Sequence, residues 1–308
     1  MKTILKQLGY SVSETKESLD NQKIDVFIIH NSDGTTRWIW PEHVKQPLFL
    51  KFYMVNGIKS LMFSIAIKLM FLFKLQSIFF KKKRLFITEI APDVSFDIMM
   101  PWALFKGTIG PNNKSVVFTQ KDGIDSFIKI AGTEKAQKLI EKEATLLNRL
   151  RVSNIQTFVF PEVVDLTNSV LQLSDISKDA ERTSQLSDAH INALIEMNEL
   201  TSIKMTLSEN ECWNNLKKEL SHLADNQDSR MPKGMIRKLN KLIKQINGNE
   251  EIEVCLSHGD FTPWNMFVKD DQLHIYDWEL ADYFKPLGFD LFHFIVQQGI
   301  LVKHKSWA

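Results

Sequence analysis

A polar stretch near the C-terminal end of the sequence has residue types and a spacing that could do chemistry. Residues 256–279 read LSHGDFTPWNMFVKDDQLHIYDWE. The apolar run before it is typical of a strand, and MFVK and LHIY predict a hairpin around the turn DDQ. Such a hairpin returns the chain beside itself, so Asp260, Asn265 and Asp277 can converge. Three oxygen-bearing side chains at one point suit a hard cation such as Mg²⁺.

Several of these residues also have a structural interpretation. His258 and Asp260 form a His-x-Asp pair, which is also typical of an oriented metal ligand or of a buried hydrogen bond. Asp270 and Asp271 are interpreted as solvated turn residues. Glu279 is either a second metal ligand or a surface group.

The full pattern resembles a known family. H-x-D-x-x-x-x-N, beginning at His258 and followed 12 residues later by an aspartate at the end of a strand, is similar to the aminoglycoside phosphotransferase and choline kinase family, which has a protein-kinase-like fold. By this resemblance Asp260 accepts the proton of the attacking hydroxyl, while Asn265 and Asp277 bind Mg²⁺ on the phosphates of ATP. The resemblance also implies that His258 holds the loop and that Asp290, in GFDLFHF, is the structural aspartate below it.

The remaining elements read as short strands and then helices. A helix is expected over residues 133–150, where apolar residues recur at three- and four-residue steps, and at least three helical pieces are expected between about residues 181 and 247. Alternating or continuous apolar runs predict strands over 24–30, 35–40, 114–118, 126–131, 157–164 and 169–176, and another that ends near Lys106.

The resemblance implies a nucleotide site on these strands. A kinase-like fold carries a lysine on its third strand, here Lys129, to bind the α- and β-phosphates, and a helix glutamate, here Glu143, to pair with it. Glu141 is the alternative partner, but it lies off the helix face that carries Leu147. A lysine in an apolar strand is also typical of an edge residue whose amine reaches solvent.

The turn FKGTIGPNNKS is expected to lie over the phosphates. Gly107 and Gly110 would let backbone amides approach the nucleotide closely. Thr108 and Lys114 are further candidates for phosphate contact. The alternative is a plain hairpin turn, because the segment departs from the protein-kinase pattern G-x-G-x-x-G.

The segment LQLSDI lies where the family has its interlobe hinge, so the backbone of Ser174 and Ile176 is expected to bind adenine. No protein-kinase activation segment or A-P-E follows Asp277, which argues against a protein substrate. Acidic helices that would bind a polycationic aminoglycoside have no evident counterpart.

A strongly apolar segment precedes these elements. Residues 48–80 are rich in Leu, Ile, Met and Phe and are followed at once by KKKR. Residues 58–84 are expected to form one or two helices whose apolar stripe is buried either on the rest of the fold or on lipid. The stripe consists of Leu61, Ile65, Leu69 and Leu72 and continues to Phe79.

Two placements of this segment remain open. One is a helix packed on the rest of the fold. The other is a basic amphipathic helix, within residues 48–84, lying on an anionic membrane surface. Lys59, Lys68 and Lys74 disfavour a true span, because each lysine at the bilayer centre would cost ~3 kcal/mol. If the surface placement holds, charge reversal at residues 81–84 should weaken membrane association.

Composition limits the classes of partner and compartment. The 308 residues include 38 basic and 37 acidic side chains, so the net charge of +1 provides no field that favours nucleic acid. Cys212 and Cys255 have no zinc-binding spacing, which fits a reducing compartment. The N-terminal residues lack the continuous apolar core of a signal peptide. A cytoplasmic protein is expected, with peripheral membrane contact as the open alternative.

The resemblance, together with this order of strands and helices, implies an α+β, protein-kinase-like two-lobe fold with a small antiparallel-sheet N-lobe and a mainly helical C-lobe. Residues 1–97 would be an appended region with a basic amphipathic helical segment, 98–176 the nucleotide-binding N-lobe and 177–308 the catalytic C-lobe. The expected activity is transfer of the γ-phosphoryl group of ATP, with Mg²⁺, to a hydroxyl of a small molecule or glycan.

Two questions remain open: which molecule accepts the phosphoryl group, and whether the protein catalyses the transfer. The GTIGPNNK turn and the N-terminal region resemble uncharacterised phosphotransferase-like proteins of bacterial surface-polysaccharide loci, which suggests a sugar or lipid-linked glycan acceptor. Two alternatives are a pseudokinase and a membrane-surface, nucleotide-binding scaffold. Either would bind nucleotide or a partner without catalysing phosphoryl transfer.

Overall fold

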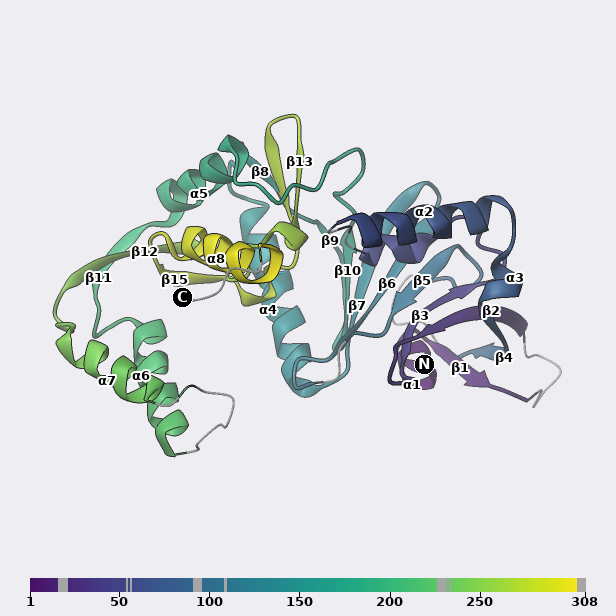
Figure 1. Ribbon diagram of the computed structural model, residues 1–308, viewed down its shortest axis with the longest axis horizontal. Helices are drawn as coiled ribbons and strands as arrows, with labels where there is room; N and C mark the ends of the chain where they lie inside the picture. Colours follow the sequence, from purple (N-terminus) through teal and green to yellow (C-terminus); the bar gives the residue numbers. More distant parts are fainter. Residues whose placement is uncertain are drawn as a thin grey trace. The chain divides into compact units, whose positions relative to one another are not determined.

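The computed structural model describes residues 1–15, 22–53, 55, 57–90, 96–107, 110–225, 232 and 234–303. Its contacts divide the chain into two compact units (Figure 1). The first unit comprises Met1–Asn154, Val159–Glu181 and His274–Glu279, and the second comprises Ile155–Phe158, Arg182–Leu273 and Leu280–Ala308.

The first unit is built on one antiparallel sheet of nine strands in the order β1-β4-β2-β3-β5-β6-β7-β10-β9. The sheet is larger than the small one expected, because the first 97 residues contribute four of its strands. Its strands are β1 (Tyr10–Ser13), β2 (Gln22–His30), β3 (Thr36–Pro41), β4 (Lys81–Glu89), β5 (Trp102–Phe105), β6 (Lys114–Lys121), β7 (Ile124–Ala131), β9 (Val163–Leu166) and β10 (Val170–Ser174).

Both faces of this sheet are apolar. Successive strand residues point to opposite sides, and β2 and β3 contain runs of consecutive apolar residues. Val26 and Ile28 pack on one face, which α1 (Lys2–Gln7) covers. Phe27, Trp38 and Trp40 pack on the other face. That aromatic face is covered by η1 (Leu48–Phe52) and α2 (Ile58–Leu72), and α3 (Gln76–Phe79) follows α2 along the chain.

The prediction for residues 58–84 is wrong for residues 81–84, and the placement of the apolar stripe on the rest of the fold is also wrong. Residues 81–84 do not extend a helix but begin β4, where Lys82 pairs with Glu42 and Arg84 pairs with Asp25. The predicted apolar stripe is the exposed side of α2, and Ile67 and Phe71 are buried instead. Helical spacing identifies an apolar face, but it does not identify which of two apolar faces meets the aromatic side of the sheet.

The helix after the first-unit strands is formed as predicted. It is α4 (Glu134–Leu150), and the Thr133 side chain caps its first turn by accepting a hydrogen bond from the Ala136 amide at 3.1 Å. The strands before it, β5 to β7, lie where the sequence predicted them. This order of strands and helix places Lys129 and Glu143 on neighbouring elements.

The second unit is mainly helical and carries residues 256–273 of the polar stretch, whereas residues 274–279 belong to the first unit. The three predicted helical pieces are confirmed as α5 (Asp188–Thr201), α6 (Glu211–Asp225) and α7 (Met235–Gln245). The helix α8 (Phe289–Gln297) and the strands β11 (Ile203–Thr206) and β15 (Asp282–Pro286) were not predicted. The α+β class is confirmed.

Two small sheets position the loop residues. The strand β12 (Glu251–Ser257) lies between β11 and β15 and leads into His258. The predicted hairpin is β13 (Met266–Lys269) and β14 (Gln272–Ile275), which form a sheet with β8 (Phe158–Val159). Within the described ranges, none of the helices combines the length and the apolar character needed to cross a membrane.

Candidate active site

Lys129 and Glu143 form a buried ion pair in the first unit. The Lys129 Nζ lies 2.8 Å from Oε1 and 2.7 Å from Oε2 of Glu143. Both side chains are buried, and Glu143 is fully so. The lysine is thus held by the glutamate on α4, as expected, and Glu141 instead accepts a hydrogen bond from Gln137.

Asp277 completes this cluster. Its Oδ1 lies 2.5 Å from the Lys129 Nζ, and its backbone has a left-handed φ of 64°. The amide of the next residue, Trp278, donates to Glu143 Oε1 at 3.1 Å, which ties the end of the hairpin to α4. Burial opposes the charge of Lys129, but the carboxylates of Asp277 and Glu143 outweigh burial and raise its pKa above the ordinary value. The lysine therefore stays charged.

The cluster has the donor chemistry of a hard cation site. Carboxylate oxygens of Glu143, Asp277 and Glu279 lie within 4.8 Å of one another, and oxygen ligands suit Mg²⁺. Glu279 also pairs with Lys114. Burial lowers the pKa of Lys114, and the nearby Lys129 lowers it further. These carboxylates are oxygen donors of the kind that a divalent cation takes, and in the structure each of them pairs with a lysine.

Asp260 has two hydrogen-bond donors in the second unit. Its Oδ2 accepts from Asn265 Nδ2 at 2.9 Å, and its Oδ1 lies 3.1 Å from Nε2 of His293 on α8. The Asp260 side chain keeps 29% of its surface exposed. Its carboxylate is thus oriented at both oxygens while remaining accessible.

His293 was missed by the sequence reasoning. The available signal was its position three residues after Asp290, which places both side chains on one side of a helix. The two predicted metal ligands are also distributed between the units, because Asp277 belongs to the first and Asn265 to the second.

A buried aspartate fixes the loop that carries Asp260. The carboxylate of Asp290 accepts from the amides of His258 at 2.6 Å and of Gly259 at 3.0 Å. Burial raises the pKa of Asp290. Gly259 has a φ of 82°, and a Cβ there would lie 2.3 Å from the carbonyl oxygen of Leu280. The loop therefore requires glycine at this position for both conformation and space.

Replacing Asp290 by alanine is expected to destabilise the protein by about 2 kcal/mol or more. The substitution leaves the His258 and Gly259 amides without their acceptor, and each buried unsatisfied group costs ~1–3 kcal/mol. Urea unfolding measures the effect. Asp188→Ala is the matched control, because Asp188 occupies the first turn of α5 but is exposed; its effect should stay near 0.5 kcal/mol. Equal losses in the two variants would contradict the anchoring role of Asp290.

The glycine turn makes a close backbone contact of its own. Gly107 has a φ of 68°, and a Cβ there would lie 1.9 Å from the carbonyl oxygen of Lys114. This contact by itself requires glycine. A Cβ at Gly110 would meet nothing within 4 Å. Thr108 lies outside the described residues, and phosphate contact by this turn remains a prediction.

The backbone groups expected to bind adenine already have partners. The Ser174 amide donates to the Glu162 carbonyl at 3.0 Å, and the Ile176 amide donates to the Tyr276 hydroxyl at 2.6 Å. The Tyr276 hydroxyl in turn donates to Asp175, and burial together with this carboxylate raises the pKa of Tyr276. Adenine binding at Ile176 remains a prediction, and it would require Tyr276 to move.

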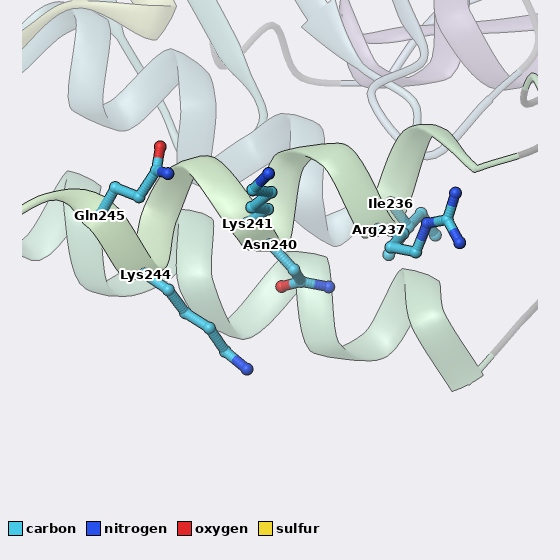
Figure 2. Close-up of a pocket in the computed structure, with 6 residues that line it drawn as sticks. All are labelled: Ile236, Arg237, Asn240, Lys241, Lys244 and Gln245. Atoms are coloured by element: carbon cyan, nitrogen blue, oxygen red, sulfur yellow. The ribbon is translucent and has the colours of Figure 1, made fainter.

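A groove on α7 lies apart from the predicted site residues. Its lining includes three basic side chains, and none of the residues predicted for catalysis, nucleotide or metal contributes to it. Figure 2 shows the lining residues along this one helix: Ile236, Arg237, Asn240, Lys241, Lys244 and Gln245.

No family model matches the sequence, and no curated protein matches it. Solved structures do match. A complex of gentamicin with APH(2'')-IIa is 17% identical with a TM-score of 0.42, over 58% of this chain and 65% of that one, so this chain spans just under two thirds of it.

Two further solved structures also match the chain. A macrolide 2'-phosphotransferase from Brachybacterium faecium is 12% identical over 59% of this chain and 67% of its own, with a TM-score of 0.42. A protein described as a fructosamine-3-kinase from Thermobifida fusca is 17% identical over 64% and 72%, with a TM-score of 0.44. The structures similar to this chain thus include phosphotransferases and a kinase that act on small molecules.

Proposed function

We propose that the protein transfers the γ-phosphoryl group of ATP to a hydroxyl of a small molecule or glycan. The observation that carries the proposal is the ion cluster of Lys129, Glu143 and Asp277 in the first unit. A charged lysine beside a partly exposed carboxylate suits phosphate oxygens and a divalent cation.

The first unit would hold the nucleotide. Lys129 would bind phosphate oxygens, with Glu143 keeping its amine in place. Asp277 would hold Mg²⁺, with Asn265 of the second unit as the other proposed ligand. Bound Mg²⁺ neutralises negative charge that develops on the phosphate oxygens. Lys129 and Glu143 would position the phosphates.

The second unit would activate the acceptor. The hydroxyl oxygen attacks the γ-phosphorus, the bond between that phosphorus and the bridging oxygen breaks, and ADP leaves. The hydroxyl proton passes to the carboxylate of Asp260. Asn265 and His293 each contact one oxygen of this carboxylate. Together they would fix its orientation toward the acceptor.

Replacing His293 by leucine is expected to lower kcat roughly tenfold, the effect of losing one hydrogen bond to a charged group. The KM for ATP should be unchanged. His293→Gln should recover much of the activity, because the glutamine amide can donate to Asp260. Steady-state kinetics at saturating ATP measure both variants, and the exposed His43 provides the control substitution His43→Leu. If Gln and Leu behave alike, His293 does not orient Asp260.

We propose a sugar, or a glycan of surface-polysaccharide metabolism, as the acceptor class. The support for this choice is the resemblance of the GTIGPNNK turn and the N-terminal region to phosphotransferase-like proteins of bacterial surface-polysaccharide loci.

A screen of hydroxyl-bearing metabolites and glycans with γ-labelled ATP tests the function. The expected result is Mg²⁺-dependent transfer of label to at least one sugar or glycan, absent in the Asp260→Asn variant. ATP binding without transfer to any member of a broad panel would instead favour a pseudokinase. Absence of ATP binding would contradict the proposed nucleotide site.

A further inference from the structure

The helix α2 is apolar on two opposite sides, and the described chain covers only one of them. Ile67 and Phe71 are buried against the aromatic face of the sheet, and Figure 1 shows α2, in dark blue, lying along the sheet strands. On the other side lie four residues at three- and four-residue steps. They remain exposed by 49% at Leu61, 48% at Ile65, 46% at Leu69 and 72% at Leu72.

This outer apolar face extends beyond the four residues. Ile58 and Met62 share the same side of α2 by their spacing and are also exposed. In the chain that follows, Phe73, Ile78 and Phe79 are exposed as well. Apolar residues scattered singly over a surface need no explanation, but a contiguous group of this extent marks an interaction surface.

The charges around this face all have one sign. Lys59 lies three residues from Met62, and Lys68 lies three from Ile65 and four from Leu72, so lysines border the outer apolar face. Lys74 follows the helix. All three lysines are exposed, and none of them forms an ion pair with a described residue.

The sequence around the helix has no acidic side chain that could offset these lysines. No aspartate or glutamate occurs between residues 43 and 88. The basic run at 81–84 behaves differently, because Lys82, Lys83 and Arg84 pair with acidic residues of the surrounding chain. The lysines beside α2 therefore remain available to an anionic partner, whereas much of the 81–84 charge is neutralised.

We infer that the outer apolar face of α2, with Lys59, Lys68 and Lys74, docks on the surface of an anionic lipid bilayer. Apolar side chains would enter the acyl boundary while the bordering lysines reach the headgroups. The same helix uses its opposite face to pack on the sheet, so it would lie in the plane of the interface.

Charge argues against a second copy of the chain as the occupant. Two copies related by a twofold axis would present the same surface to each other. That arrangement would bring lysines toward lysines and supply no acidic partner from residues 43–88. An anionic headgroup layer satisfies both the apolar area and the charge. The inference does not depend on phosphoryl transfer.

Sedimentation with vesicles tests this inference. The wild-type protein should pellet with vesicles of equal parts phosphatidylcholine and phosphatidylglycerol and bind pure phosphatidylcholine much more weakly. The triple variant Lys59→Glu/Lys68→Glu/Lys74→Glu should bind the anionic vesicles on the order of 100-fold more weakly, because each lysine near such a surface contributes about fivefold. Leu61→Gln/Ile65→Gln/Leu69→Gln should lose measurable binding, at about tenfold for each apolar side chain.

The control places the same charge change on another exposed basic helix. Lys241→Glu/Lys244→Glu on α7 should bind vesicles as the wild type does. Circular dichroism melts check that each variant folds, which is expected because the altered side chains are exposed. The inference is overturned if wild-type protein stays in the supernatant, or if the α7 variant alone loses binding. If the wild-type protein does not bind vesicles and is a dimer by light scattering that the apolar variant dissociates, the outer apolar face of α2 binds a second copy of the chain, and the inference is overturned.

Discussion

Asp260→Asn is expected to lower turnover on the order of 10²- to 10⁴-fold, the usual loss when a general base is removed. ATP binding with Mg²⁺ should persist, because Asp260 belongs to the second unit and not to the Lys129 cluster of the first unit. An amide at position 260 also cannot accept from both Asn265 and His293. Single-turnover transfer of label and calorimetric titration of ATP separate the two effects.

Two other substitutions serve as a control and as a comparison for this result. Asp271→Asn makes the same chemical change at an exposed turn residue whose φ of 62° asparagine tolerates, and it should behave as the wild type. Asp277→Asn should instead weaken Mg²⁺-dependent ATP binding, because a charged oxygen ligand is lost. If Asp260→Asn keeps full activity on the true acceptor, the loop is not catalytic and the proposed enzyme activity is wrong.

Lys129→Met is expected to lower turnover on the order of 10²- to 10³-fold, as for removal of a positioned electrostatic group. The variant should also be less stable, because Glu143 is fully buried and removing one partner of a buried pair costs about 3–5 kcal/mol. The variant should therefore unfold at lower urea concentration and also be inactive.

A double variant separates folding from function. Lys129→Met/Glu143→Gln removes the buried charge, and the glutamine oxygen can still accept from the Trp278 amide. Much of the lost stability should return, since replacing both partners of a buried pair is often nearly neutral. Turnover should remain low, because no lysine ammonium group meets the phosphates. Recovery of turnover together with stability would mean that Lys129 acts only in the fold.

Local sequence determined most of the elements that carry the candidate site. The strand β7 and the helix α4 have clear apolar periods, so Lys129 and Glu143 could be placed on neighbouring elements before their contact was known. The hairpin β13–β14 follows from two short apolar runs around an Asp-rich turn. These features depend on residues close together in the chain, which is why their spacing was sufficient.

Tertiary structure alone decided the features that depend on distant residues. The strand β4 pairs with β1 and β2, far away in the sequence, so KKKR could not be recognised as the start of a strand. His293 reaches Asp260 only because α8 packs beside the loop, and Tyr276 meets Ile176 across 100 positions. For α2, both sides are apolar, so the period of the helix was compatible with either one facing inward. The aromatic surface of the sheet, assembled from separate strands, selected Ile67 and Phe71 and left the other side exposed.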